Sequence, residues 1–219
     1  MNASAATSGD YIGVLLAAGT GSRYLAATAT NARDHAGHAT PPHKLLATLP
    51  DGQAVAASAA RTLRTALPHT LAVITAQPPD LERQLAGAGC EILLIPPKPS
   101  GMGVSLAAAA RHLLSRQHTR PPAGCVVALA DMPWLQADTV SQLLAHAAHD
   151  RIVVPVYHGQ RGHPVVFGAQ FFSELATMNG DTGAKSLLAR HGVVAIECDD
   201  PGILRDIDVP ADLYPSIDE

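Results

Sequence analysis

A glycine-rich segment directly after an apolar run is the first part of the chain whose residue types could do chemistry. Residues 14–23 read VLLAAGTGSR, so a predicted strand passes into a loop that contains Gly19 and Gly21. Glycine tolerates positive φ angles and carries no Cβ, so the backbone N–H groups of such a loop can approach an anion closely. Arg23 adds a guanidinium that can bind two phosphate oxygens at once. The segment is typical of a loop that binds a polyphosphate.

The glycine spacing disfavours two common classes of phosphate-binding protein. The chain has no GxxxxGK[ST] motif, and its GxG lacks the third glycine of the dinucleotide fingerprint. A P-loop ATPase and an ordinary NAD-binding domain are therefore disfavoured. A GxG alone is also compatible with a plain turn after a strand, so the interpretation depends on residues elsewhere.

Acidic residues and a lysine supply those partners. Asp131 follows the apolar run CVVALA, which predicts a carboxylate at the carboxyl end of a strand, where it could hold Mg²⁺ or cap the next turn. Asp206 and Asp208 alternate along a predicted short edge strand that stops at Pro210, and either could be a second metal-facing carboxylate. Lys44 could place a point charge beside a phosphate.

Two later glycine-rich segments precede predicted helices. Gly101 and Gly103 lie before an alanine-rich helix, whose free N-terminal amides could bind an anion or a base, while Ser105 could bond a ligand or the helix end. The segment Gly180–Lys185 opens another helix, with Asp181 available. Both segments could also be ordinary helix entries.

The segment between Arg23 and Lys44 is predicted to be irregular. Residues 25–43 read LAATATNARDHAGHATPPH, and we expect an inserted loop that acts as a mobile lid. Its histidines, His35, His38 and His43, raise the possibility of a metal site. Because no carboxylate or cysteine has a matching spacing, solvated loop histidines are favoured.

Alternating apolar runs and helical segments predict an α/β fold with a mainly parallel sheet, in a single domain over residues 1–219 with a flexible N-terminus at 1–10. Residues 158–167 predict a small β-hairpin insertion. The predicted strands are Tyr11–Ala17, Leu71–Thr75, Glu91–Ile95, Cys125–Ala130, Arg151–Tyr157 and Val193–Glu197, and the predicted helices are Gln53–Ala66, Pro79–Ala88, Val104–Ser115, Gln136–Ala148, Ala169–Thr177 and Thr182–Arg190.

The composition limits the partners and the compartment. The 219 residues are 47% hydrophobic and carry a formal net charge of −4, without the basic surplus of a nucleic-acid-binding protein. Three distant cysteines favour a reducing compartment. We also find no basic leader and no apolar run near the ~18 residues of a membrane span, so we expect a cytoplasmic protein with no membrane or nucleic-acid partner.

Seven motifs in order give the chain a resemblance to a known family. They are LAAGTGSR, KLL, SGMGVSL, LADMP, GHPVVF, GDTGAKSLL and DIDVPADL. Together they span nearly the whole chain and resemble the molybdenum cofactor cytidylyltransferase family, within the wider MobA-like nucleotidyltransferases.

The resemblance implies a Rossmann-like three-layer fold and a reaction. It implies that CMP passes from CTP to molybdopterin-bound molybdenum, with release of pyrophosphate and a requirement for Mg²⁺. The product would serve xanthine dehydrogenase-type hydroxylases, which suggests transient contact with such a hydroxylase or its chaperone.

Site residues follow by position from the same resemblance. Arg23, Lys44 and Asp131 would be catalytic, and Asp131 with Asp208, or Asp206 in its place, would hold the metal. The second substrate would lie against His163, Gly180, Asp181 and Gly183. The nucleotide would lie against Leu16, Ala17, Ala18, Gly19, Gly21, Arg23, Lys44, Gly101, Met102, Gly103 and Ser105.

The chain departs from the family pattern in two ways. Tyr24 follows Arg23 where the family usually has an RMG step, and twenty residues separate Arg23 from Lys44 where the family has only a few. LAAG favours the cytidylyl branch, while the guanylyl branch more often has LAGG. A guanylyltransferase or another MobA-like nucleotidyltransferase, a nicotinamide-dependent oxidoreductase and a non-catalytic cofactor-binding module remain as alternatives.

Overall fold

The computed structural model describes residues 11–31, 43–98, 101–116, 121–180 and 183–214. The predicted flexible N-terminus, most of the predicted insertion with His35 and His38, and Asp181 lie outside these ranges. Within them, no helix is long and apolar enough to cross a membrane.

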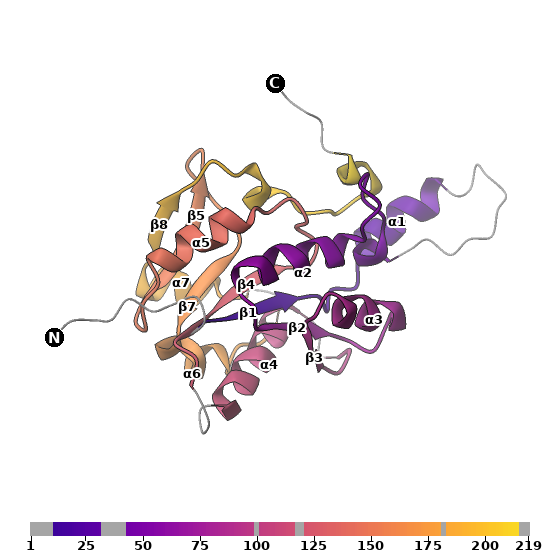
Figure 1. Cartoon of the computed structure of the whole chain (residues 1–219). Coiled ribbons are helices and arrows are strands. Elements are labelled where there is room, and N and C mark those ends of the chain that lie inside the picture. The colour runs from indigo at the N-terminus through magenta and orange to yellow at the C-terminus, as the bar shows by residue number, and fades with distance from the viewer. Residues whose placement is uncertain (1–10, 32–42, 99–100, 117–120, 181–182, 215–219) are drawn as a thin grey trace.

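A mixed sheet forms the centre of the molecule (Figure 1). Its order is β3-β2-β1-β4-β7-β5-β6, with β8 paired to β5. β1, β2, β3 and β4 pair in parallel, whereas β7 is antiparallel to both β4 and β5. β5 therefore runs in the direction of β4, and β8 is parallel to β5. The strands are β1 Tyr11–Leu16, β2 Thr70–Ile74, β3 Glu91–Leu94, β4 Gly124–Leu129, β5 Ile152–Tyr157, β6 Gln160–Arg161, β7 Val165–Gly168 and β8 Val194–Glu197.

Helices cover both faces of the sheet, which confirms the predicted Rossmann-like α/β architecture (Figure 1). The side chains of β1 alternate between the two cores, since Leu15 belongs to one hydrophobic cluster and Val14 to the other. The first cluster takes side chains from α2, α3 and α5, and the second from α4, α6 and α7. The helices are α1 Ser22–Asn31, α2 Val55–Ala66, α3 Pro79–Gly87, α4 Met102–Ser115, α5 Ala137–Ala145, α6 Phe172–Leu175 and α7 Lys185–His191.

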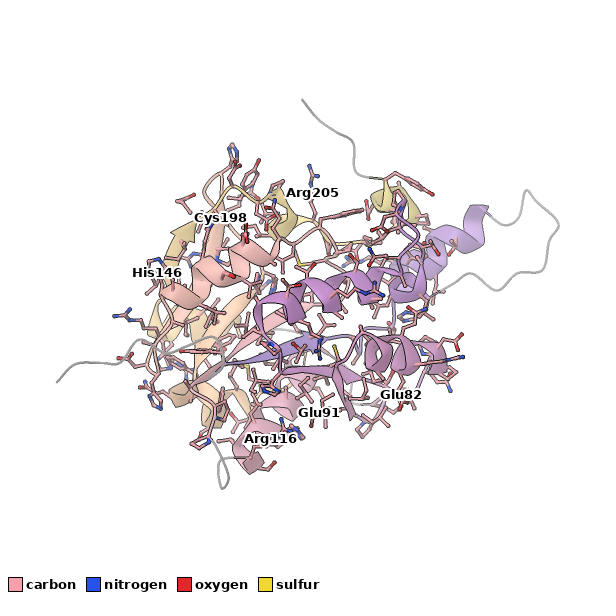
Figure 2. All side chains as sticks on the ribbon, viewed as in Figure 1. Glu82, Glu91, Arg116, His146, Cys198 and Arg205 are labelled. Carbon is pink, nitrogen blue, oxygen red and sulfur yellow. The ribbon has the colours of Figure 1, made fainter. Side chains whose placement is uncertain are left out.

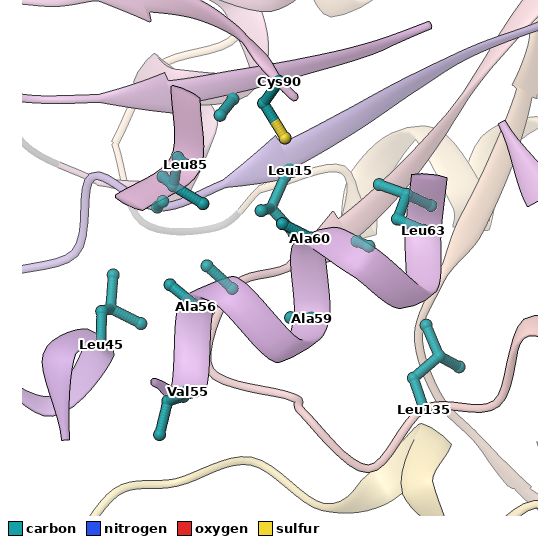
Figure 3. Close-up of a cluster of buried hydrophobic side chains, with 14 of the residues drawn as sticks. Leu15, Leu45, Val55, Ala56, Ala59, Ala60, Leu63, Leu85, Cys90 and Leu135 are labelled. Carbon is teal, nitrogen blue, oxygen red and sulfur yellow. The ribbon is translucent and has the colours of Figure 1, made fainter. Parts of the chain in front are cut away.

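The first core shows why α2 lies close against the sheet. Ala56, Ala59, Ala60 and Leu63 recur at helical spacing on one face of α2 and are at most 3% exposed, with Leu15 of β1 beside them (Figure 3). Small alanine side chains let the helix backbone approach the strands. This packing fixes the position of β1 against α2, and with it the start of the loop that follows β1.

Charged side chains gather on the outside of these layers (Figure 2). At the edge strand β3, the Glu91 carboxylate accepts hydrogen bonds from His112 of α4 at 3.1 Å and from Arg116, the residue that follows α4, at 2.8 Å. Such exposed pairs contribute little stability, typically below ~1 kcal/mol.

The predicted hairpin is confirmed between β5 and β6. Its two-residue turn is His158–Gly159, with φ angles of 48° and 76°, the positive values of a type I′ turn. The chain then passes Gly162, where a Cβ would lie 2.2 Å from the Ile203 carbonyl oxygen, and enters β7. The hairpin thus packs directly against the C-terminal segment.

Two predictions about local structure are wrong. Residues 25–31, predicted as irregular, belong to α1, because Leu25 and the alanines that follow sustain a helix once Gly21 has turned the chain. The edge strand over Asp206 and Asp208 does not form. The N–H groups of Asp208 and Val209 donate instead to the Asp212 carboxylate, both at 2.8 Å.

Boundaries near the C-terminus also shift. The predicted helix 169–177 divides into a 3₁₀ helix, Ala169–Phe171, and the short α6, while α7 begins at Lys185. The segment after β8 contains the 3₁₀ helices Pro201–Leu204 and Pro210–Leu213, and the second has Pro210 in its first turn.

Candidate active site

A cavity of about 450 Å³ opens at the carboxyl ends of β1 and β4. This is the edge of a parallel sheet at which ligands of α/β proteins bind. Predicted site residues that line it are Leu16, Ala17, Ala18, Gly19, Gly21, Lys44, Gly101, Met102, Ser105 and Asp131. Sequence reasoning missed Thr20, Ser22, Leu45 and Leu129, which line it too. The first three adjoin predicted residues in the sequence, and Leu129 lies two residues before Asp131.

Lys44 lies at the centre of a charged cluster beside this cavity. Its Nζ is 2.6 Å from Asp131 Oδ2 and 3.4 Å from Asp208 Oδ1, and it donates to the Ile207 carbonyl at 3.1 Å. Arg23 donates from Nη1 to the other oxygen of Asp208 at 2.5 Å. Four charged side chains that are distant in the sequence therefore form one network of alternating sign.

Each member of the cluster is positioned by a different element. Lys44 begins the 3₁₀ helix Lys44–Leu46, Asp131 follows β4, and Arg23 lies in the first turn of α1. The C-terminal segment reaches the site because the Ile207 N–H donates to the Asp131 carbonyl at 2.9 Å. That bond places Asp208, and not Asp206, against the lysine.

The surroundings shift the pKa values of the two partners in opposite directions. Burial alone would lower the pKa of Lys44, which is 8% exposed, but the Asp131 and Asp208 carboxylates outweigh burial and raise it. Partial burial would raise the pKa of Asp208, but hydrogen bonds from Arg23 and Lys44 lower it. Both groups are therefore charged at neutral pH.

The pKa of Asp206 shifts in the opposite direction to that of Asp208. Its pKa is raised by partial burial and by the negative charges of Asp131 and Asp208. A third carboxylate thus adds to the negative charge around Lys44 without contacting it in the way Asp208 does.

The loop after β1 has the geometry expected of an anion cradle. Gly21 has a φ of +62°, and α1 begins at the next residue, Ser22. A Cβ on Gly21 would lie 3.2 Å from Lys44 Cγ, so the glycine lets the loop approach the lysine stem. On the far side of Lys44, a second hollow of about 210 Å³ is lined by Gly21, Ser22, Arg23, Tyr24, Lys44 and Asp208. Arg23 borders this hollow, beside Lys44, and is not among the residues that line the main cavity.

His43 links the loop to the lysine. Its Nδ1 accepts a hydrogen bond from the Leu45 N–H at 3.3 Å, and its Nε2 lies 3.2 Å from the Gly19 carbonyl oxygen. The expectation of a solvated loop histidine is therefore wrong for His43, which is half-buried and caps the 3₁₀ helix of Lys44. A histidine directly before the lysine was the signal that sequence reasoning passed over.

The two later glycine segments contact each other. The Gly103 N–H donates to the Gly180 carbonyl at 2.9 Å, and a Cβ on Gly103 would lie 2.7 Å from the Asn179 carbonyl oxygen. Gly183 lies against Met102, since a Cβ added at Gly183 would lie 3.2 Å from the Met102 sulfur. Gly103, Gly180 and Gly183 thus join the two segments and do not line the cavity, while Met102 does.

His163 lies behind the site. Burial lowers the pKa of its imidazole, although a bond with the Val127 backbone and the charge of Asp131 act in the other direction. Its Nδ1 is buried and has no hydrogen-bond partner among the residues that the structure describes. The structure therefore brings His163 near Asp131 but does not place it on the cavity wall.

Comparison with known families identifies the family to which the chain belongs. A sequence profile described as the MobA-like NTP transferase domain matches residues 13–195. The chain belongs to the MobA-like NTP transferase family. No curated protein is detectably similar to this MobA-like transferase in sequence.

Solved structures share the fold of this chain. An Rv0371c homologue from Mycobacterium sp. strain JC1 is 24% identical with a TM-score of 0.75, and the alignment covers 94% of each chain. A nucleotidyl transferase from Methanothermobacter thermautotroptrophicus is 20% identical with a TM-score of 0.75 over 92% of this chain and 93% of that one. Rv0371c of Mycobacterium tuberculosis in complex with manganese is 25% identical with a TM-score of 0.66 over 92% and 95%.

The donor set of this MobA-like transferase fits a hard divalent cation. The carboxylates of Asp131 and Asp208 converge on one point, where the Lys44 ammonium lies. Among the described residues, no three histidine, cysteine or acidic side chains form a metal-binding group. A bound Mg²⁺ or Mn²⁺ would therefore take its remaining ligands from phosphates and water, as Mg²⁺ commonly does.

Proposed function

We propose that this nucleotidyltransferase transfers CMP from CTP to molybdopterin-bound molybdenum and releases pyrophosphate, to supply xanthine dehydrogenase-type hydroxylases. The observation that carries the transfer is the position of Lys44 between Asp131 and Asp208, at the edge of a cavity walled by the glycine loop. The choice of CTP and of the molybdenum cofactor is supported by the LAAG and SGMGVSL motifs and their order in the chain.

Positioning and charge neutralisation account for the chemistry. An oxygen of the terminal phosphate on the pterin substrate attacks the α-phosphorus of the nucleotide. A new P–O bond forms as the bond to the β-phosphate breaks, and pyrophosphate leaves with the electron pair. The backbone amides of the glycine loop would hold the phosphates, and Lys44 and Arg23 would offset the growing negative charge. This reaction requires no protein nucleophile.

Asp131 and Asp208 would hold the divalent cation, whose contribution would be to neutralise phosphate charge and fix phosphate geometry. With the cation bound, the Lys44 ammonium would be free to move from the carboxylates toward a phosphate. Leu16, Leu129 and Met102 give the cavity an apolar wall suited to a flat base.

The decisive experiment offers each of the four nucleoside triphosphates to the protein with molybdopterin cofactor and Mg²⁺ or Mn²⁺. We expect pyrophosphate release with CTP and a product that carries CMP. Preference for GTP would refute the base assignment and leave the transfer intact. Absence of pyrophosphate with every nucleotide would refute the transfer itself.

Asp131→Asn tests the site in the same assay. We expect it to lower pyrophosphate release by at least about 10²-fold, since it removes a carboxylate that would hold the cation and pairs with Lys44. Asp150→Asn is the matched control, because Asp150 is exposed in a turn before β5. Equal turnover in the two variants would remove Asp131 from the mechanism.

A further inference from the structure

One side chain holds both halves of the proposed phosphate site together. His43 accepts the Leu45 N–H on Nδ1 and contacts the Gly19 carbonyl oxygen through Nε2, so it joins the 3₁₀ helix of Lys44 to the loop after β1. Because Nδ1 is an acceptor, the neutral ring must carry its proton on Nε2, which then donates to Gly19. Both ring nitrogens are therefore engaged, because a ring that accepts on Nδ1 keeps its proton on Nε2 for the contact with Gly19.

We propose that His43 is a positioning residue, which fixes the glycine loop and Lys44 in the arrangement that accepts the triphosphate. This inference rests on the proposed nucleotidyl transfer and adds to it a residue that the family motifs do not contain.

The effect on the loop follows from peptide geometry. The Gly19 carbonyl and the Thr20 N–H belong to one planar trans peptide, so they point in opposite directions. Holding the carbonyl toward His43 turns the Thr20 N–H away from His43. Thr20 lines the main cavity, where such an amide can donate to an anion. Without His43, this peptide could rotate and present its carbonyl oxygen to a phosphate.

The effect on the lysine follows from capping. The Leu45 N–H is one of the amides that a short helix leaves without a partner at its start, and His43 Nδ1 satisfies it. The cap fixes the first turn, which carries Lys44 toward Asp131 and Asp208. The surroundings also favour the neutral ring, since burial lowers the pKa of His43 and the neighbouring Lys44 charge adds to that effect, against the Gly19 contact.

Two substitutions separate the two contacts. In His43→Asn the side-chain oxygen can still accept the Leu45 N–H, because asparagine is a good N-cap, but the amide is too short to reach Gly19. In His43→Gln the longer amide can reach Gly19, but it caps the helix poorly. His146→Asn is the control, because His146 is an exposed histidine that follows α5 (Figure 2).

The assay measures nucleotide binding and thermal unfolding separately. Titration calorimetry with CTP, and with the other three nucleotides in parallel, gives Kd before any second substrate is added. We expect His43→Asn to unfold near the wild-type temperature and to bind about fivefold more weakly, the factor of one ordinary hydrogen bond. We expect His43→Gln to unfold at a lower temperature and to bind more tightly than His43→Asn.

The outcomes separate this inference from the proposed function. Wild-type affinity in His43→Asn, with normal turnover by the wild-type protein, would overturn the role of His43 alone. A lower unfolding temperature with unchanged Kd in both variants would reduce His43 to a structural cap and also overturn it. A wild-type protein that binds nucleotide but releases no pyrophosphate would overturn the proposed transfer, while weaker binding by His43→Asn would still support the positioning role.

Discussion

Replacing Lys44 by methionine tests the charged cluster most directly. The substitution keeps an unbranched apolar stem and removes the ammonium that contacts Asp131, Asp208 and the Ile207 carbonyl. Loss of one partner from a fully buried ion pair costs about 3–5 kcal/mol. The side chains of Asp131 and Asp208 remain 20% and 35% exposed, so water can replace part of the interaction.

We therefore expect the free energy of unfolding to fall by about 2 kcal/mol. For a domain of this size that corresponds to a decrease in Tm of about 4–8 °C. Turnover should fall further, by about 10²–10³-fold, because the lysine would oppose charge that develops on the leaving pyrophosphate. Added Mn²⁺ should raise the Tm of Lys44→Met more than that of the wild type, because the ammonium no longer competes for the same carboxylates.

Differential scanning fluorimetry with and without Mn²⁺ measures the stability terms, and pyrophosphate release measures turnover. Lys185→Met is the matched control, because Lys185 is exposed at the start of α7. Turnover of Lys44→Met within threefold of wild type would refute the assignment of Lys44 to the phosphate site. Equal Tm values would refute the energetic role of the cluster.

Three further predictions concern stability. Gly103→Ala should cost about 1–3 kcal/mol in urea unfolding, because its Cβ would lie 2.7 Å from the Asn179 carbonyl oxygen, whereas Gly87→Ala, with open space around it, should not destabilise. Asp200→Ala should cost about 2 kcal/mol, since this carboxylate, 1% exposed, accepts the N–H of Gln136, the residue before α5, at 3.0 Å; an unchanged denaturation midpoint would contradict this. Burial lowers the pKa of His43 below its ordinary 6.5, so as the pH falls the imidazole is protonated in the unfolded chain before it is protonated in the folded one. The free energy of unfolding should therefore fall as pH drops below about 6.5. His43→Asn should flatten this pH dependence, and parallel curves for variant and wild type would argue against it.

Sequence patterns predicted the strands and the helices of the parallel half well, because β1, β2, β3 and β4 are short, mainly apolar runs separated by amphipathic helices. Residues 25–31 were harder to predict, because alanine and threonine carry little hydrophobic periodicity. The helix there depends on its start after Gly21, a tertiary feature of the loop.

The sequence predicted the residues of the site but not the contacts between them. Motif order brought Lys44, Asp131 and Asp208 to attention, but no pattern indicates that Asp208 meets the lysine in preference to Asp206. That choice depends on the bond from the Ile207 N–H to the Asp131 carbonyl, which joins segments that are far apart in the chain. The role of His43 depends likewise on a contact across the site, with Gly19.

The segment after Glu197 has two structural roles. The family profile ends at residue 195 and the last strand ends at Glu197, so Asp208 joins the charge network from beyond both. The same segment buries Ile203, Ile207 and Leu213 in the first core. Cleavage after Glu197 would therefore remove core side chains together with a carboxylate partner of Lys44, so that stability and the charge network would be lost together.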